Sequence, residues 1–347
     1  MQRTHTCGEL AEKNIGEVVT LCGWVHTRRD HGGLIFVDLW DKTGLTQVVL
    51  NPQIDKLAHQ EAQSLRGNFV ISVQGKVRAR PEDMVNLKLK TGAIEVYIDE
   101  LEILNPSSTP PFSCWENQEV GEALRLKHRY LDLRSLELQR NLELRYKITR
   151  AVRDVLHHKG FIEIETPILT KSTPEGARDY LVPSRLNPKK FYALPQSPQL
   201  FKQTLMVSGM DRYFQIVKCF RDEDLRQDRQ PEFTQIDMEM SFVDEGQLFS
   251  LAEEMIATIY KETLGIEVET PFPVLKYKDS MNRFGTDKPD LRFGLEIVDV
   301  GEVVRGTGFK VFAQALDAGG QVKAINVKGS AESLSRKALD DLTEVAK

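Results

Sequence analysis

The stretch that decides the fold is residues 220–237, FRDEDLRQDRQPEFTQID, a highly charged connection between two runs rich in β-branched and aromatic residues. Those runs, at 212–220 and 233–242, predict two strands. A polar loop between two such strands is typical of a hairpin. The sequence therefore predicts a hairpin whose connecting loop carries a high density of charge.

The spacing of charges within the predicted strands indicates which side chains lie together. Alternate residues of a strand share a face, so we expect Arg221 and Glu223 to point together, and Gln235, Asp237 and Glu239 to do the same. Charged side chains on an otherwise apolar sheet must pair or meet a ligand. Mutual salt bridges on an exposed sheet are one interpretation, and a site for a charged ligand is the other.

Helices are predicted on both sides of this hairpin. Apolar residues at 144, 148, 152, 155 and 156 follow the spacing of an amphipathic helix over 138–159, ended by Gly160. Further runs predict a strand at 191–194 and helices at 199–208 and 247–263. In the first of these helices Gln199 and Lys202 share a face, which can set an ammonium against a substrate carboxylate. A solvated surface lysine is the alternative.

The N-terminal part predicts a small barrel. Five strand-like runs occur at 18–26, 34–40, 45–50, 69–77 and 94–104, with a helical segment at 54–65 after the third. This order is that of an OB-fold, whose face and loops commonly bind single-stranded nucleic acid, although other small barrels also have five strands. The Pro- and Ser-rich stretch 105–111 predicts a domain boundary.

The net charge of the chain is compatible with a nucleic-acid partner when the charges are counted separately for each region. The 347 residues predict two or three domains, and 46 Lys+Arg against 51 Asp+Glu give a net charge of −5. Residues 122–159 hold ten basic and five acidic side chains, a local charge of +5, so the remainder carries −10. Most of these side chains are expected to form a solvated helix face. The overall sign does not exclude a local basic surface.

Cysteine usage predicts a reduced, cytoplasmic protein. The four cysteines are far apart, without the spacing of a zinc site or a disulfide framework. No run approaches eighteen consecutive apolar residues, so no membrane partner is expected.

The charged hairpin resembles a known family. Phe220-Arg221-x-Glu223 followed by Arg229-x-x-x-Phe233-x-x-x-Asp237 resembles motif 2 of class II aminoacyl-tRNA synthetases, and HKGFIEIETP (158–167) resembles motif 1, their dimer-interface element. Behind an OB-fold, this order resembles the subclass that activates aspartate, asparagine or lysine. Three segments resemble bacterial aspartyl-tRNA synthetases in particular: STPEGARDY (172–180), QSPQLFKQ (196–203) and DKPDLR (287–292).

The resemblance implies an α+β multidomain architecture and an aspartate–tRNA ligase activity. ATP and L-aspartate would form aspartyl-adenylate, with Mg²⁺ accompanying ATP, and the aspartyl group would pass to tRNA-Asp. The implied domains are an OB-fold anticodon-binding domain (1–104), a linker (105–140), a catalytic core with an antiparallel sheet flanked by helices (141–288), and the beginning of an inserted α/β domain (289–347). A homodimer through motif 1 is also implied.

The resemblance assigns roles to individual residues. Arg221 would be the catalytic residue, stabilising charge at the reacting phosphate. Aspartate would be surrounded by Glu175, Ser197, Gln199, Lys202, Arg221, Gln235 and Asp237. ATP would meet Arg221, Asp222, Glu223 and Gln230. The anticodon would be read by Arg28, Arg29, Phe36, Gln47 and Glu95, a set that combines stacking with polar contacts. His31 resembles the variant of this loop in enzymes that also charge tRNA-Asn. No metal ligands are identified.

The sequence departs from the family after Asp290, where we identify no motif 3, the Gly-rich element that supplies the γ-phosphate arginine. We therefore expect an N-terminal fragment with an incomplete adenylation site, weak tRNA binding and little aspartate-dependent pyrophosphate exchange. A non-catalytic tRNA-binding module, using the barrel and the basic 122–159 region, is the alternative. An enzyme for asparagine or lysine is another, and Lys202 disfavours lysine because two ammonium groups repel.

Overall fold

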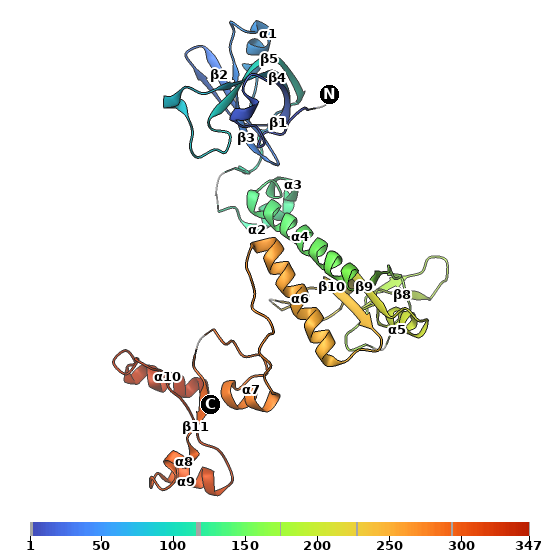
Figure 1. The fold of residues 1–347 in the computed structure, drawn as a ribbon, viewed down its shortest axis with the longest axis vertical. Coiled ribbons are helices and arrows are strands. Elements are labelled where there is room, and N and C mark those ends of the chain that lie inside the picture. Colours follow the sequence, from blue (N-terminus) through green and yellow to red (C-terminus); the bar gives the residue numbers. More distant parts are fainter. Residues whose placement is uncertain (1–2, 116–118, 174, 227, 293, 347) are drawn as a thin grey trace. The chain divides into compact units, whose positions relative to one another are not determined.

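A computed structural model describes residues 3–115, 119–173, 175–226, 228–292 and 294–346 (Figure 1). Pro174 and Gln227, which belong to two of the segments singled out in the sequence, lie outside these ranges. The chain divides into two compact units, Met1–Arg145 and Tyr146–Lys347.

The first unit contains a closed five-stranded barrel in the order β1-β2-β3-β5-β4. Helix α1 follows the third strand, so the predicted OB-fold order is confirmed. The pairs are antiparallel except β3 with β5, which is parallel. The elements are β1 (Val18–His31), β2 (Leu34–Asp41), β3 (Gly44–Leu50), α1 (Lys56–Ala62), β4 (Val70–Ala79) and β5 (Ile94–Asn105), with short 3₁₀ helices at Glu12–Asn14 and Glu82–Met84.

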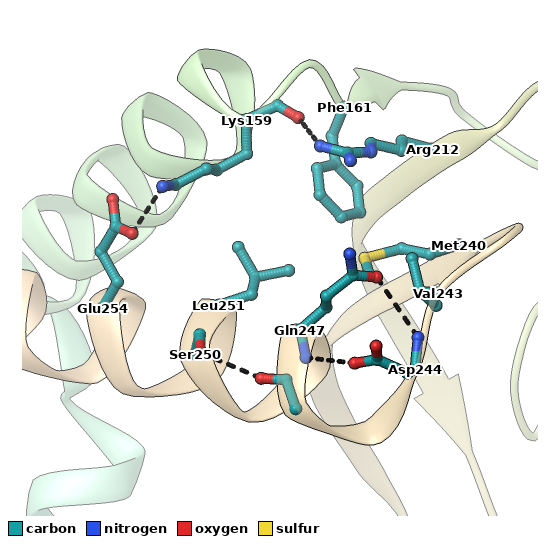
Figure 2. Close-up of a pocket in the computed structure, with 11 residues that line it drawn as sticks. Lys159, Phe161, Arg212, Met240, Val243, Asp244, Gln247, Ser250, Leu251 and Glu254 are labelled. Atoms are coloured by element: carbon teal, nitrogen blue, oxygen red, sulfur yellow. Dashed lines mark hydrogen bonds and ion pairs between the residues drawn. The ribbon is translucent and has the colours of Figure 1, made fainter. Parts of the chain in front are cut away.

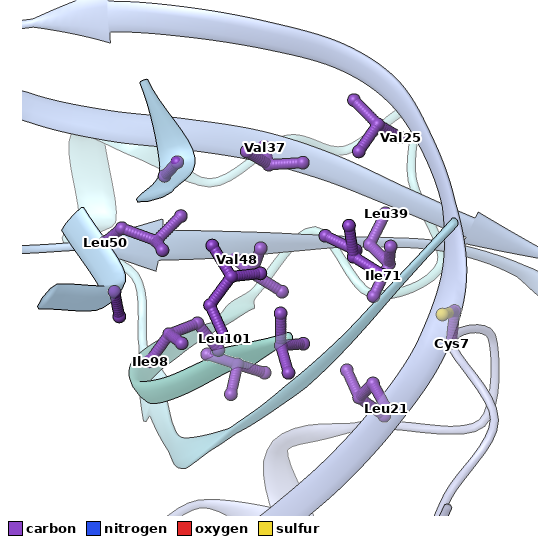
Figure 3. Close-up of a cluster of buried hydrophobic side chains, with 14 of the residues drawn as sticks. Cys7, Leu21, Val25, Val37, Leu39, Val48, Leu50, Ile71, Ile98 and Leu101 are labelled. Atoms are coloured by element: carbon purple, nitrogen blue, oxygen red, sulfur yellow. The ribbon is translucent and has the colours of Figure 1, made fainter. Parts of the chain in front are cut away.

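Alternation along each strand fills the barrel interior. In β1, Val19, Leu21, Gly23 and Val25 are buried and the residues between them are half-buried. Figure 3 shows the resulting cluster, in which valine, leucine and isoleucine from all five strands meet. Such β-branched and aliphatic side chains pack well on the concave face of a small barrel.

The turn between β1 and β2 is tight because two glycines occupy the left-handed region. Gly32 and Gly33 have φ of 58° and 80°, as a two-residue hairpin turn requires. His31 therefore lies at the exposed end of β1, paired with Leu34.

The segment after the barrel packs against it through an aromatic cage. Its helices are α2 (Glu122–Lys127) and α3 (Arg129–Asp132). The Arg134 guanidinium lies 5.0, 5.5 and 4.8 Å from the ring centroids of Trp24, Trp40 and Trp115, and donates to Asn68 Oδ1 at 2.9 Å. These are the three tryptophans of the chain, so all of them belong to the first unit.

The second unit is built around the predicted hairpin. Strands β9 (Arg212–Phe220) and β10 (Glu232–Met240) are antiparallel, and β6 (Ile162–Glu163) adds to β9 in parallel, giving the order β10-β9-β6. Helices α4 (Leu136–His158) and α6 (Glu245–Leu264) pack on one face of this sheet through Val152, Leu156, Phe214, Leu251 and Met255. The described part of the unit also contains β7 (Leu181–Pro183), β8 (Phe191–Ala193), α5 (Gln199–Val207), α7 (Tyr277–Phe284), β11 (Ile297–Asp299), α8 (Gly301–Val304), α9 (Lys310–Asp317), β12 (Lys323–Ile325) and α10 (Arg336–Ala346).

One sequence expectation about the hairpin is wrong. Arg221 and Glu223 do not alternate on a strand, because β9 ends at Phe220. The Arg221 amide still donates to Pro231 O at 2.9 Å, but the Asp222 amide leaves the hairpin and donates to Arg178 O at 3.0 Å. The second strand follows the expectation, with Gln235, Asp237 and Glu239 at alternate positions of β10. The predicted domain boundaries remain predictions.

Candidate functional site

The two faces of the β9–β10 hairpin differ in chemistry. Even-numbered residues such as Phe214 and Met238 pack on α4 and α6. Odd-numbered residues form the other face, where Asp237 lies opposite Gln215 and Glu239 lies opposite Tyr213 in the register. Asp237, Gln215 and Tyr213 are all buried, so this second face is both polar and shielded from water.

Lys202 supplies the cation of this face. It projects from α5, and its Nζ donates to Asp237 Oδ1 at 2.7 Å and lies 3.4 Å from Glu239 Oε2. Lys202 is 9% exposed and Asp237 7%. Burial opposes the ammonium charge, but the two carboxylates outweigh it, so the pKa of Lys202 is raised and the side chain stays charged. Lys202 is thus a buried charged group rather than a surface lysine.

The second carboxylate oxygen of Asp237, Oδ2, is a buried acceptor without a hydrogen-bond partner among the described residues. The Tyr213 hydroxyl donates to Gln215 Oε1 at 3.1 Å, which also accepts from Thr166 Oγ1 at 2.9 Å, and it lies close enough to the Asp237 carboxylate for hydrogen bonding to contribute to the raised pKa of Tyr213. Burial and the nearby Asp237 charge raise the pKa of Tyr213, which keeps its proton. A buried acceptor without a donor is costly unless a ligand supplies one.

Buried Gln196 is hydrogen-bonded to two residues of the segment 175–180. The Gln196 amide donates to Ala177 O at 2.8 Å and to Asp179 Oδ1, and it accepts from Ala177 N at 3.0 Å. Beside it, Ser197 Oγ donates to Glu175 Oε2 at 3.1 Å. Glu175 and Ser197 line a cavity of about 230 Å³ that also includes Leu200 and Phe201. Two of the predicted substrate residues therefore meet at one hollow.

Arg221 lies at the end of β9 with a partly free guanidinium. Its Cζ is 5.1 Å from the centroid of the Phe233 ring, and its Nε is buried without a hydrogen-bond partner among the described residues. An aromatic face can hold a guanidinium without consuming its donors. The arrangement leaves Arg221 able to bind an anion.

The predicted nucleotide-binding residues lie in the exposed connection between β9 and β10. Asp222, Glu223 and Gln230 are all exposed there. Glu223 is 3.6 Å from Arg229 Nη1, an exposed ion pair. These three residues are near Arg221 in the chain and are exposed to solvent.

The structure adds Cys219 to the site, which the sequence reasoning had considered only for metals and disulfides. Its thiol is fully buried and lies 3.2 Å from Gln235 Oε1, to which it donates. Cys219 follows the odd-numbered alternation of Tyr213 and Gln215, and that period of two was the signal in the sequence. Gln199 is half-buried at the first turn of α5, one turn before Lys202.

Three of the predicted anticodon residues gather on the outer face of the barrel. Phe36 lies opposite Arg29, and Gln47 lies opposite Asp38. One Arg29 nitrogen donates to both Asp38 oxygens at 2.9 Å. Arg28 makes different contacts, with Ala62 O of α1 at 2.9 Å and with Asp30.

Glu95 joins this face through Arg80, a residue that the sequence reasoning missed. Burial raises the pKa of Glu95, and the Arg80 charge acts in the opposite direction. Burial lowers the pKa of Arg80, and the charges of Asp38 and Arg29 also act on it. Its Nη2 is buried without a hydrogen-bond partner among the described residues. Nearby, the Arg78 guanidinium stacks 4.3 Å from the Tyr97 ring centroid.

A larger cavity of about 410 Å³ lies away from this chemistry. Figure 2 shows its lining, in which Lys159 pairs with Glu254 and Asp244 caps the start of α6. It includes Met240, which belongs to the even-numbered face of the sheet, whereas Lys202 and Asp237 belong to the odd-numbered face. We therefore place the candidate site at the smaller hollow and the buried ion pair.

The part of the chain that the structure describes contains no cluster of three or more His, Cys, Asp or Glu side chains that could hold a metal ion. In the same ranges, no helix is both long and apolar enough to cross a membrane. All four cysteines are unpaired.

Two family models match the chain. The model described as tRNA synthetases class II (D, K and N) matches residues 121–336, and an OB-fold nucleic acid binding domain of the anticodon type matches residues 19–104. The first match covers most of the second unit and the segment before it, and the second match covers the barrel.

The chain is similar to bacterial proteins over its whole length. It is 59% identical to an aspartate–tRNA(Asp/Asn) ligase of Desulfotalea psychrophila, covering all of this chain and 57% of the relative. It is 58% identical to an aspartate–tRNA ligase of Bacillus licheniformis, covering 99% of this chain and 58% of the relative. The chain thus spans somewhat more than half the length of the curated relatives it matches.

Solved structures share the fold. Asparaginyl-tRNA synthetase from Pyrococcus horikoshii, complexed with asparaginyl-adenylate, matches with a TM-score of 0.66 and 25% identity over 77% of this chain and 59% of that one. A putative aspartyl-tRNA synthetase from Leishmania major matches with a TM-score of 0.67 and 22% identity, over 76% of this chain and 53% of that one.

Proposed function

This chain belongs to the class II tRNA synthetases (D, K and N), and from that premise we propose that it forms the anticodon-binding and amino-acid-binding part of an aspartate–tRNA ligase. The enzyme would join L-aspartate to ATP with loss of pyrophosphate and then transfer the aspartyl group to tRNA-Asp. The names of the bacterial relatives, at 58–59% identity, support aspartate over asparagine and lysine.

The observation that carries this proposal is the buried arrangement of Lys202 and Asp237. A substrate with both an ammonium and a side-chain carboxylate fits it, because Asp237 Oδ2 is an acceptor without a donor among the described residues and Lys202 is a charged donor. In this proposal the substrate ammonium binds Asp237 and the β-carboxylate binds Lys202. Lysine would place its ammonium against Lys202, and such like-charge contacts are unfavourable.

Arg221 is proposed to act on the reacting groups. Its guanidinium, stacked on Phe233, would bind the α-phosphate and the attacking carboxylate and stabilise the charge that develops there. Glu175, Ser197, Gln199 and Gln235 would orient aspartate from the sides. Asp222, Glu223 and Gln230 would meet ATP from the exposed connection, which must then close over the nucleotide.

Magnesium is proposed only as a companion of ATP. Because the described residues hold no cluster of three metal-ligating side chains, they do not form a cage for Mg²⁺. Mg²⁺ is commonly bound through one or two carboxylates and substrate phosphates, where it would neutralise phosphate charge.

The outer face of the barrel is proposed to read the anticodon. Phe36 would stack on an unpaired base, and Arg29, Gln47 and Glu95 would contact base edges or phosphates. Arg28 would contribute from the neighbouring surface. We propose tRNA-Asp as the partner, and tRNA-Asn as a second one, because His31 stands exposed at the β1–β2 turn and the Desulfotalea relative is named for both tRNAs.

Assembly and location complete the proposal. Apolar side chains are exposed on and beside the predicted motif 1 element, among them Tyr146, Ile162 and Leu169, and this supports a homodimer through that element. Sedimentation of the purified chain tests it.

A cytoplasmic location is supported by the unpaired cysteines, as expected of a reducing compartment.

A chimaera tests the ligase proposal directly. These residues replace the matching 346 residues of the Desulfotalea relative, which supplies the rest of its own length. We expect attachment of aspartate to tRNA-Asp, and we expect Lys202→Ala to lower kcat/KM for aspartate by about 100-fold or more, since a buried substrate charge loses its partner. Lys218→Ala, at an exposed lysine of β9, is the matched control and should keep full activity.

The same measurements can refute the proposal. Charging of asparagine or lysine in preference to aspartate would reject it, and unchanged aspartate kinetics in Lys202→Ala would remove Lys202 from the site. Tight tRNA binding without any charging by the chimaera would favour the second candidate, a non-catalytic tRNA-binding module.

A further inference from the structure

Cys219 lies at the centre of the candidate site although neither the family motifs nor the comparisons assign it a role. It is the last odd-numbered residue of β9, directly opposite Phe233, and its side chain is fully buried. The charges that act on its thiol come from Asp237, Arg221, Glu175 and Lys202. The charges of four proposed substrate-binding residues therefore act on one thiol.

The thiol contacts a fifth proposed substrate-binding residue, Gln235. Cys219 Sγ lies 3.2 Å from Gln235 Oε1, close enough for the S–H group to donate. Burial, followed by the Asp237 charge, raises the pKa of the thiol to about 11, so the proton needed for this bond is present at neutral pH.

The direction of this bond decides which end of the Gln235 amide is available. A glutamine amide has an acceptor end and a donor end of nearly equal size, and its neighbours select the orientation. Because Oε1 accepts from the thiol, Nε2 is the end that can donate to a ligand. A donor at this point can bind an acceptor oxygen of a ligand.

We propose that Cys219 is a positioning residue that holds the Gln235 amide with its Nε2 directed at an acceptor oxygen of the substrate. The inference rests on the proposed function, because it takes Gln235 as a substrate contact. The opposing interpretation is that Cys219 only fills space in the sheet. The two interpretations predict different results when Cys219 is replaced by a side chain of similar size that cannot donate a hydrogen bond. A positioning role predicts weaker substrate binding, and a space-filling role predicts no change.

Binding of a non-hydrolysable aspartyl-adenylate analogue to the full 347-residue chain, measured by calorimetry, tests the inference. Cys219→Ser keeps a donor, whereas Cys219→Val removes it at similar volume and Cys219→Ala removes it without overpacking. We expect about 3- to 10-fold weaker binding in the Val and Ala variants and a change within about twofold in the Ser variant, the range of one neutral hydrogen bond. In a Gln235→Ala background, Cys219→Ala should cause no further loss.

A readout that needs no ligand separates this inference from the proposed function. The side-chain amide signals of Gln235, assigned by their absence in Gln235→Ala, should show a more rigid side chain by nitrogen-15 relaxation in the wild type and Cys219→Ser than in Cys219→Ala, because a bond to Oε1 fixes the amide while leaving Nε2 free. Cys7→Ala, at a buried thiol of the barrel, is the control and should leave these signals unchanged.

Each outcome supports or overturns a specific statement. Equal analogue binding in wild type and Cys219→Ala would overturn the positioning role. Unchanged nitrogen-15 relaxation of the Gln235 amide in Cys219→Ala would overturn it as well, even if the chain bound no analogue. Absence of analogue binding in the wild type, with the amide rigid as expected, would count against the proposed function and leave the thiol–amide bond established.

Discussion

The barrel and the β9–β10 hairpin place their charges in opposite ways. On the outer face of the barrel, Arg29 pairs with Asp38 while its side chain remains 57% exposed. In the hairpin, Lys202 and Asp237 pair with side chains only 11% and 7% exposed. The main buried cluster of the barrel is apolar, although Asp41 and Glu95 are also buried there, whereas the hairpin buries a complete ion pair on one face of its sheet.

The difference reflects what each surface has to bind. A flexible, unpaired RNA segment can be stacked and contacted from an exposed face, with little need to bury protein charge. A small charged amino acid is discriminated from neutral analogues only where a missing partner is costly, and that requires a desolvated site. We therefore expect charge changes to alter the free energy of unfolding far more in the hairpin than on the barrel.

Because all three tryptophans lie in the first unit, their fluorescence reports its unfolding, while helical circular dichroism also follows the second unit.

The largest expected effect is that of Lys202→Met. Removing the cation leaves Asp237 buried with an uncompensated charge, which typically costs about 3–5 kcal/mol. Denaturant unfolding followed by circular dichroism should show the loss, with tryptophan fluorescence unchanged. Lys218→Met, which removes an exposed pair with Glu232, is the control and should cost less than about 1 kcal/mol. Equal losses of stability in Lys202→Met and Lys218→Met would show that the buried ion pair contributes no more than an exposed one.

The barrel should respond most to loss of apolar volume. Leu39 is fully buried in the barrel core, so Leu39→Ala should cost about 3 kcal/mol through lost transfer energy and a cavity. Here the fluorescence transition should move to lower denaturant. A shift in the circular dichroism transition of the second unit alone would show that the core of the barrel was assigned wrongly.

The buried thiol of the hairpin predicts a loss of stability at high pH. The pKa of Cys219 in the folded state is raised from 9.0 to about 11, so the unfolded chain releases its proton first. The contribution of the Cys219 thiol to the free energy of unfolding is complete below pH 9. It falls as the pH rises towards 11, by up to about 2–3 kcal/mol. Cys219→Val should flatten this part of the pH–stability curve. An unchanged slope in the variant would place the titration elsewhere.

The smallest effect on stability is expected for Arg29→Ala. The exposed pair with Asp38 should contribute less than about 1 kcal/mol, so the fluorescence transition should barely move. Affinity for tRNA should nevertheless fall and its dependence on salt should weaken, because a phosphate or base contact is lost. Lys42→Ala, at an exposed barrel lysine paired with Glu143, is a matched control. Equal tRNA affinity in the Arg29 and Lys42 variants would argue against the proposed anticodon face.

Much of the fold was predictable because it depends on local pattern. The alternation of Val19, Leu21 and Val25 indicated a strand with one buried face, and the amphipathic spacing around Val152 indicated α4. The grouping of Asp237 and Glu239 followed from the period of two along β10. Arg221 was placed wrongly on a strand, because a charged run before Pro231 contains no local mark of where pairing stops.

The sequence by itself determined the barrel order, the hairpin, the alternating faces and the family resemblance, since each depends on residue type and spacing along the chain. Only the tertiary structure decided which distant groups meet. Lys202 reaches Asp237 across 35 positions, Arg134 enters a cage of three tryptophans, and Cys219 orients Gln235 across the hairpin. The physical reason is that burial, dielectric environment and hydrogen-bond direction arise when separate elements pack, and no single segment contains them.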